Sequence, residues 1–380
     1  MTDPAPLALL PAGLRDLLPP DAAHEAAVAA ALGSVFASHG YEPVKPPLVE
    51  FEDSLFAGIG AATAAATFRL MDPASRRMMG VRADLTPQIA RIAAHRLARA
   101  PRPLRLSYAG DVLRVAGGQL RPEREFLQVG VELIGSDAAA ADAEVILLAA
   151  EALTGVGVAR LTVDLTQPTL VRAVCQGFGL DDAAMDAVRA ALDRKDANAV
   201  AATGGAAAET LAALLRAAGA HPRATEALAA IALPEAARAA RDRLVAVAGL
   251  VAEAAPERVL TVDPVEYRGF EYQTGVSFTL FGPGVRGDLG RGGRYAAAAG
   301  EPATGFTLFM DSVLRALPGP KRVPRLFLPH GAPHVEAARL RAEGWIVVAG
   351  LAPVADPIAE AARLGCGHVR VDGAVVALPA

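Results

Sequence analysis

Polar and apolar side chains alternate along one segment near the middle of the chain, EFLQVGVELI. Gln128 and Glu132 have one parity, whereas Val129 and Val131 have the other. Because alternate residues of a strand point to the same face, the two polar side chains would lie side by side over the gap left by Gly130. A strand that only builds a core would not place Gln, Gly and Glu in register. We therefore predict that this face is the floor of a small-molecule pocket.

Three further segments carry polar side chains of the kind that hold a zwitterion. Asp84 and Thr86 lie in RADLTP, Arg114 ends the strand LSYAGDVLR, and Arg268 and Tyr272 share a parity in VEYRGFEYQTG. Carboxylates suit an ammonium group or an imidazole N–H, and arginine suits a carboxylate through paired hydrogen bonds. No single residue is decisive, but their joint spacing indicates one pocket.

Each of these residues also has a purely structural interpretation. Thr86 precedes a proline and could cap a helix that begins there, with Asp84 as a second cap. Arg114 could pair with Asp111 or Glu123 at the surface. Both interpretations of each residue stay open at this point.

Other motifs argue against catalysis and against metal binding. The charged run RPERE suits a solvated loop as well as a phosphate clamp, and GDLGRGGRY lacks the Gly-Lys-Ser/Thr ending of a P-loop. The histidines show neither HExxH nor a zinc spacing. No nucleophile elbow and no Ser-His-Asp set is evident. We expect no catalytic residue, no metal and no cofactor.

Composition predicts a globular protein of two or three domains. A chain of 380 residues is too long for one compact core, and 53% hydrophobic with 21% charged residues argues against disorder. No apolar run approaches the roughly 20 residues that span a bilayer, and no export signal is expected. Cys175 and Cys366 show no pairing pattern, so a reduced, cytoplasmic setting is expected. The net charge of −4 makes nucleic acid an improbable partner.

Periodicity and turn residues place the predicted elements. A hairpin is expected at 66–82, a helix from Thr86, two strands within 104–135 and strands at 258–262 and 265–281. A final helix is expected at about 305–316.

Two regions stand apart from this core. Residues 168–256 are Ala-rich, amphipathic and almost free of aromatic residues, which predicts a helical insertion. Residues 325–380 alternate strands and helices, which predicts a small α/β domain after the linker 318–324. The fold class is therefore α+β, with a core over 1–320.

At these motifs the chain resembles the class II aminoacyl-tRNA synthetases of the histidyl type, over about residues 10–316. GYEPVKPPLVE resembles the first class motif, VLRVAGGQLRPEREFLQVGVELIG the second, and GGRY with GFTLFMDSVLRAL the third. RGFEYQTG resembles the histidine-specific signature RGLDYYT. The resemblance implies an antiparallel sheet flanked by helices and self-association as a dimer through the first motif. It also implies that histidine contacts Asp84, Thr86, Arg114, Gln128, Glu132, Arg268 and Tyr272.

The third motif departs from the catalytic pattern GFAxGxERL. Phe309 stands at its second Gly, Asp311 at its Glu and Ser312 at its Arg. The Arg of that pattern grips the ATP triphosphate, and losing such a group removes charge stabilisation of several kcal/mol. Gln273 also replaces an aromatic residue or His, and Asp84 replaces Glu. We therefore expect no adenylation of histidine.

A synthetase-like histidine pocket without ATP machinery is typical of the regulatory subunits of short-form ATP phosphoribosyltransferase, whose signature RGFEYHTGxxFxLF is close to RGFEYQTGVSFTLF. This resemblance implies a non-catalytic chain that activates a short catalytic subunit in the first step of L-histidine biosynthesis. It further implies a hetero-octamer of four plus four chains and feedback inhibition by L-histidine. The C-terminal domain resembles a trimmed anticodon-binding domain. The alternatives are a histidyl-tRNA synthetase with an altered third motif, and a paralogue that modifies another protein or binds RNA.

Overall fold

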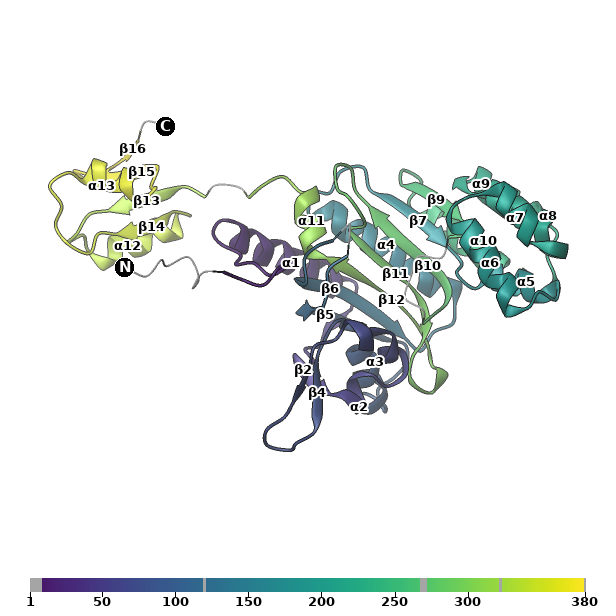
Figure 1. Ribbon diagram of the computed structural model, residues 1–380. Helices are drawn as coiled ribbons and strands as arrows, with labels where there is room; N and C mark the ends of the chain where they lie inside the picture. Colours follow the sequence, from purple (N-terminus) through teal and green to yellow (C-terminus); the bar gives the residue numbers. More distant parts are fainter. Residues whose placement is uncertain (1–8, 119–120, 267–271, 321–322, 379–380) are drawn as a thin grey trace. The chain divides into compact units, whose positions relative to one another are not determined.

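The computed structural model describes residues 9–118, 121–266, 272–320 and 323–378. The chain divides into two compact units, Met1–Pro318 and Gly319–Ala380, and each is described by itself. Figure 1 shows the elements of both units along the chain.

A nine-stranded sheet is the centre of the first unit. Its strands, in spatial order, are β1 (Glu42–Pro43), β5 (Leu104–Leu113), β6 (Glu125–Ile134), β12 (Pro302–Phe309), β11 (Gly290–Ala296), β10 (Gln273–Phe281), β7 (Thr162–Thr166), β9 (Val259–Asp263) and β8 (Gly219–Ala220). Neighbours pair antiparallel except β1 with β5 and β7 with β9, which are parallel. The central strands therefore form the antiparallel sheet expected from the sequence.

Helices cover one face of this sheet with the larger hydrophobic core. The helices α1 (Asp21–Ser38) and α4 (Ala139–Gly155) pack there, and α10 (Glu235–Ala254) packs against α4. Val129, Val131 and Leu133 of β6 point into this core, each at most 1% exposed. The parity predicted for this strand is confirmed.

The opposite face carries a second, smaller core beneath α3 (Thr86–His95). Leu85 and Ile89 pack there with Tyr108, Phe126 and Tyr295 from the sheet. The elements on this side are α2 (Glu52–Leu55), the 3-10 helices η2 (Gly58–Ala66) and η4 (Ala298–Gly300), and a three-stranded sheet of β2 (Val49–Phe51), β4 (Met78–Val81) and β3 (Arg69–Met71). Strands β3 and β4 are the predicted hairpin.

The segment 168–256 is helical, as predicted. It contains α5 (Leu170–Gly177), α6 (Asp182–Asp193), α7 (Ala197–Thr203), η3 (Gly205–Ala207), α8 (Ala208–Ala217), α9 (Arg223–Ala230) and α10. The short strand β8 interrupts the helices and pairs with β9, so this segment also extends the sheet.

Two predicted boundaries are wrong. Residues 305–309, predicted as the start of the final helix, belong to strand β12, and only α11 (Met310–Ala316) is helical. The β-branched and aromatic residues of TGFTLF suit a central strand, and β12 lies between β6 and β11. Strand β10 begins at Gln273 rather than at 265. Tyr272 directly precedes this strand, and Arg268, its predicted parity partner, lies outside the described residues.

The second unit is a four-stranded sheet with a helix packed on each of two cores. It contains β14 (Ile346–Ala349), β13 (Arg325–Leu328), β15 (His368–Val371) and β16 (Ala374–Ala377), with α12 (His334–Ala342) and α13 (Pro357–Arg363). Strands β13, β14 and β15 are parallel, as expected of an α/β unit. Across the described ranges of both units, none of the helices is both long and apolar enough to span a bilayer.

Candidate functional site

The first turn of α3 is tied to the sheet by the polar residues that the sequence singled out. Asp84 Oδ1 accepts a hydrogen bond from the Thr86 N–H at 2.9 Å, and Gln128 Oε1 accepts one from the Leu85 N–H at 3.1 Å. The Thr86 hydroxyl does not cap the helix, because it donates to Glu132 Oε1 at 2.9 Å. The capping interpretation of Thr86 is therefore wrong, and Asp84 supplies the local hydrogen bond instead.

Glu132 lies at the centre of this site and is 1% exposed. Its second carboxyl oxygen accepts a hydrogen bond from the Tyr295 hydroxyl at 2.9 Å. Burial raises the pKa of Glu132 to about 8, although the hydrogen bonds from Thr86 and Tyr295 favour the ionised form. Burial therefore favours the protonated form of this carboxyl group, and a cationic ligand beside it would favour the ionised form.

Glycines in two neighbouring strands make room for these side chains. Gly305 pairs with Glu132 across β12 and β6, and a Cβ at Gly305 would collide with the Glu132 carboxylate. A Cβ at Gly130 would collide with the Tyr108 hydroxyl. The gap over Gly130 is therefore filled by Tyr108, whose hydroxyl lies 2.6 Å from Thr307 Oγ1.

A small cavity of about 20 Å³ lies against this carboxylate. Its lining includes Thr86, Glu132 and Tyr272 from the predicted set, together with Gln273 and Arg291. The ring of Tyr272 contacts that of Tyr295 edge-on, with centroids 5.9 Å apart. A space of this size holds about one water molecule, so the described conformation is narrower than an amino acid.

Two buried polar atoms, on the side chains that hold the first turn of α3, have no hydrogen-bond partner among the described residues. They are Asp84 Oδ2, an acceptor, and Gln128 Nε2, a donor. The two side chains are 2% and 0% exposed. Buried polar groups are nearly always paired, so an unpaired acceptor and donor at one place point to a polar ligand.

The structure describes one of the two arginines predicted for the pocket, Arg114. Arg114 donates from Nε to the Ala83 carbonyl at 3.3 Å, and its guanidinium lies 5.0 Å from the centroid of the Phe126 ring. It lines a neighbouring cleft rather than the small cavity. Arg268 lies outside the described residues.

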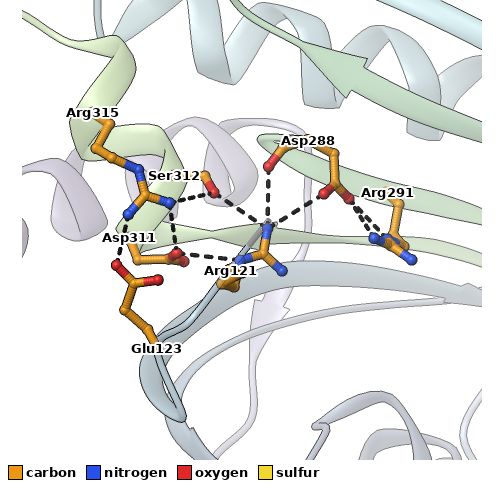
Figure 2. Close-up of polar contacts among 7 residues, drawn as sticks. All are labelled: Arg121, Glu123, Asp288, Arg291, Asp311, Ser312 and Arg315. Carbon is orange, nitrogen blue, oxygen red and sulfur yellow. Dashed lines mark hydrogen bonds and ion pairs between the residues drawn. The ribbon is translucent and has the colours of Figure 1, made fainter. Parts of the chain in front are cut away.

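Three residues of the third motif join an ionic cluster with residues of the second motif, of the turn before β11 and of β11 itself (Figure 2). The cluster comprises Arg121, Glu123, Asp288, Arg291, Asp311, Ser312 and Arg315. Arg121 Nε lies 3.2 Å from Asp311 Oδ2, and Ser312 Oγ accepts a hydrogen bond from Arg121 Nη2 at 3.2 Å. The Arg121 guanidinium stacks 3.8 Å above the Phe309 ring. Phe309, which stands where the catalytic pattern has its second glycine, thus also positions Arg121. The sequence did not predict this contact.

The sequence did not predict several residues that lie at the site. Tyr295 had no assigned role, although it stands in the GGRY motif, three residues after Gly292. The same parity puts Arg291, Gly293 and Tyr295 on the pocket face, and this pattern could have identified them. Arg315 pairs with Asp311 at 3.0 Å, one helical turn away on α11, but only the tertiary structure brings it to Glu123.

Comparisons with known proteins agree with this architecture. A sequence profile of the family described as histidyl-tRNA synthetase matches residues 13–313. The ATP phosphoribosyltransferase regulatory subunit of Paramagnetospirillum magneticum is 60% identical over 368 residues, 97% of each chain. The protein of the same name from Rhodospirillum centenum is 60% identical over 370 residues, 97% of this chain and 96% of its own.

Solved structures share the fold. The Bacillus halodurans protein described as an ATP phosphoribosyltransferase regulatory subunit/histidyl-tRNA synthetase matches with a TM-score of 0.81 and 26% identity, covering 95% of this chain and 97% of its own. Histidyl-tRNA synthetase from Nostoc sp. PCC 7120 matches with a TM-score of 0.79 over 96% of this chain and 91% of its own. At 17% identity the second match shows the fold alone, and the synthetase-like fold expected from the sequence is confirmed.

Proposed function

The chain belongs to the family of ATP phosphoribosyltransferase regulatory subunits, and from this premise we propose how it acts. It has no catalysis of its own, is required for full activity of the short-form catalytic subunit, and binds L-histidine as a feedback inhibitor. The assembly is a hetero-octamer of four regulatory and four catalytic chains, in which the regulatory chains pair as dimers. The histidine pocket consists of Asp84, Thr86, Arg114, Gln128, Glu132, Arg268 and Tyr272.

The observation that carries the histidine proposal is a pair of buried atoms, one on Asp84 and one on Gln128, that have no hydrogen-bond partner among the described residues. Asp84 Oδ2 can only accept a hydrogen bond and Gln128 Nε2 can only donate one. An amino acid brings an ammonium group that can donate to Asp84 and a carboxylate that can accept from Gln128. Glu132 adds a second carboxyl group for an imidazole N–H, and the Tyr272 ring adds an aromatic wall.

The ionic cluster supports the absence of catalysis. Arg121 is held by Asp311 and by Asp288, whose Oδ1 lies 3.4 Å from Arg121 Nη2. Ser312 carries no charge at the position where the catalytic pattern has an arginine. A triphosphate would have to displace these carboxylates from Arg121 before it could bind.

Inhibition follows from linkage between histidine and the quaternary state. If histidine binds one state of the assembly more tightly than another, it shifts the equilibrium by its differential affinity alone. A coupling free energy of about 1–3 kcal/mol is typical of such effectors. The narrow cavity favours this mechanism, because histidine binding must select or create a wider conformation.

The test is phosphoribosyl transfer by the short catalytic subunit, with and without this chain, across a titration with histidine. We expect strong activation that histidine reverses. Activation that histidine does not reverse would support the catalytic subunit as the partner and contradict the proposed histidine pocket. An absence of activation would favour the synthetase-like alternatives. Among these, histidine-dependent exchange of pyrophosphate into ATP would identify a working synthetase.

A matched pair of variants isolates the pocket. Asp84→Asn keeps an oxygen for the Thr86 N–H but replaces the unpaired acceptor with a donor. We expect the histidine concentration for half inhibition to rise at least about tenfold, because a charge-assisted hydrogen bond is lost. Asp196→Asn makes the same change at the start of α7, where Asp196 caps the helix, and should leave inhibition unchanged. Arg268→Ala should abolish inhibition.

A further inference from the structure

The turn that follows β9 leads into the histidine signature and is attached to the central sheet. Asp263 is the last residue of β9, and Glu266 stands two residues before Arg268 in the sequence. Thr166, at the end of the neighbouring strand β7, donates its hydroxyl hydrogen to the Glu266 carbonyl at 2.7 Å. The sheet therefore fixes the backbone of this turn at the point where the chain leaves it for the signature.

The helical insertion contacts the same turn through Lys195, which lies between α6 and α7 (Figure 1). Lys195 Nζ lies 2.6 Å from Asp263 Oδ2 and 3.4 Å from Glu266 Oε2. The two carboxylate side chains are each 17% exposed, and that of Lys195 is 41% exposed. One ammonium group thus pairs with both ends of the turn and joins it to the insertion.

Three carboxyl groups lie near one another at this end of the sheet. Asp164 of β7 has its pKa raised by burial first, and then by the charges of Asp263 and Glu266. The charge of Lys195 acts in the opposite direction. Without the ammonium group these carboxylates would repel one another more strongly, so Lys195 stabilises a turn that its own acidic residues would otherwise loosen.

The backbone at Lys195 gives a second reason to expect a role for this side chain. Its φ of 53° lies in the left-handed region, which residues with a Cβ rarely adopt. Glycine or asparagine would suit the end of α6 better at this position. The local backbone therefore does not account for a lysine, whereas its two ion pairs across to the turn do.

The seam between the insertion and this turn contains a small cavity. Its volume is about 10 Å³, and its lining includes Gln167, Arg189 and Glu266. Gln167 is 4% exposed, and its Oε1 has no hydrogen-bond partner among the described residues. The seam is therefore packed less tightly than a core, and the Lys195 ion pairs resist a shift of the insertion along it.

We propose that Lys195 is a positioning residue for histidine binding. By tying the helical insertion to the turn that leads into the signature, it couples occupancy of the histidine pocket to the position of the insertion. This inference rests on the histidine pocket proposed above and adds a residue that acts without touching the ligand. Because coupling between two sites is reciprocal, bound histidine should in turn strengthen the Lys195 ion pairs.

Calorimetric titration of the full 380-residue chain with L-histidine tests this role. Lys195→Met removes the ammonium group, and we expect about three- to fivefold weaker binding, the size of effect that a partly exposed ion pair can supply. Lys195→Arg should restore binding, because a guanidinium group can also pair with both carboxylates. The control, Arg238→Met, breaks an exposed ion pair with Glu235 inside the insertion and should bind as the parent chain does.

A double-variant cycle separates the ion pair from a general loss of structure. Asp263→Asn removes the partner charge but keeps an oxygen for the Val265 N–H, which donates to Asp263 Oδ1 at 3.1 Å. Combined with Lys195→Met, it should weaken histidine binding by less than the product of the two single effects. Effects that simply multiply would show that the two residues act independently and would overturn the proposal.

Trace acetylation of lysine amines supplies the reciprocal measurement. Histidine should slow the labelling of Lys195 and leave that of Lys45, which lies outside the insertion, unchanged. Equal labelling of Lys195 with and without histidine, or normal histidine binding by Lys195→Met, would overturn the role of Lys195 while leaving the pocket intact. A parent chain that does not bind histidine would instead refute the pocket itself, and with it this inference.

Discussion

Glu132 concentrates the chemistry of this pocket in one side chain. It is fully enclosed, accepts hydrogen bonds from Thr86 and Tyr295, and has its pKa raised by burial to about 8 from an ordinary value of 4.5. These hydrogen bonds, together with a longer one of 3.5 Å from the Tyr108 hydroxyl, do not offset the loss of water around the charge of a buried carboxyl group. The fold therefore favours the protonated form, and a ligand cation would favour the ionised form.

This titration predicts a pH dependence of stability. Because the folded-state pKa lies above the unfolded value, the stabilisation is complete below about pH 4.5 and is lost as the pH rises through about 8. Relative to Glu132→Gln, the parent chain should lose up to about 1.4 kcal/mol of unfolding free energy per pH unit in this window. Urea unfolding of both chains at several pH values, without histidine, measures the difference.

Parallel pH curves for the two chains would contradict the raised pKa of Glu132. Glutamine is the appropriate replacement because its amide oxygen can still accept a hydrogen bond there, and its volume matches that of glutamate. A constant offset between the curves would therefore reflect packing alone.

At the scale of elements, the pocket depends on how closely β12 approaches β6. Gly305→Ala would place a methyl group on the Glu132 carboxylate, and the adjacent carbonyl of Val131 leaves no room to yield. We expect a loss of about 1–3 kcal/mol in unfolding free energy and at least about tenfold weaker binding of histidine. Urea unfolding and calorimetry measure these two effects.

A second glycine provides the matched control. Gly249 lies within α10, and a Cβ there would meet nothing within 4 Å. Gly249→Ala should stabilise the chain by up to about 1 kcal/mol, because alanine is the better helix former, and should leave histidine binding unchanged. Equal effects of the two substitutions would show that Gly305 has no special role.

Strand β11 is anchored to α4 by a buried ion pair. Arg294 Nη2 lies 2.8 Å from Asp142 Oδ1, and the side chains are 8% and 2% exposed. Asp142→Asn would leave a buried guanidinium without its main counter-charge and should reduce the unfolding free energy by about 3–5 kcal/mol. Glu235→Gln removes an exposed partner of Arg238 and should change it by less than about 1 kcal/mol. Comparable losses would mean that burial does not strengthen the Asp142 pair.

At the scale of the whole molecule, each unit has hydrophobic clusters of its own. The cores of residues 1–318 are built by side chains of that unit, and those of residues 319–380 by Leu326, Phe327 and their neighbours. A chain truncated after Pro318 should therefore fold, and its unfolding free energy should match that of the same unit in the full chain within about 1 kcal/mol. Urea unfolding followed by circular dichroism measures this.

Leu133→Ala shows whether that measurement is sensitive enough. Leu133 is 1% exposed in the core of the first unit, and its truncation should reduce the unfolding free energy by about 2–5 kcal/mol. A truncated chain that loses as much would show that the first unit needs residues 319–380 in order to fold.

The sequence by itself determined the features that depend on local periodicity. The parity of β6, the hairpin of β3 and β4, the start of α3 and the helical run at 168–256 all follow from the spacing of apolar residues, prolines and glycines. Alternation identifies a face without any knowledge of what covers it. The same alternation correctly brought Gln128 and Glu132 to one side.

Only the tertiary structure decided which atoms meet across strands and loops. The sequence could not show that Tyr108 fills the gap over Gly130 or that Thr86 donates to Glu132 instead of capping its helix. It predicted that the final helix begins at about 305, but residues 305–309 belong to β12, which pairs with two central neighbours. The ionic cluster around Arg121 joins segments almost 200 residues apart, and contacts between such distant segments leave no periodic signal in the chain.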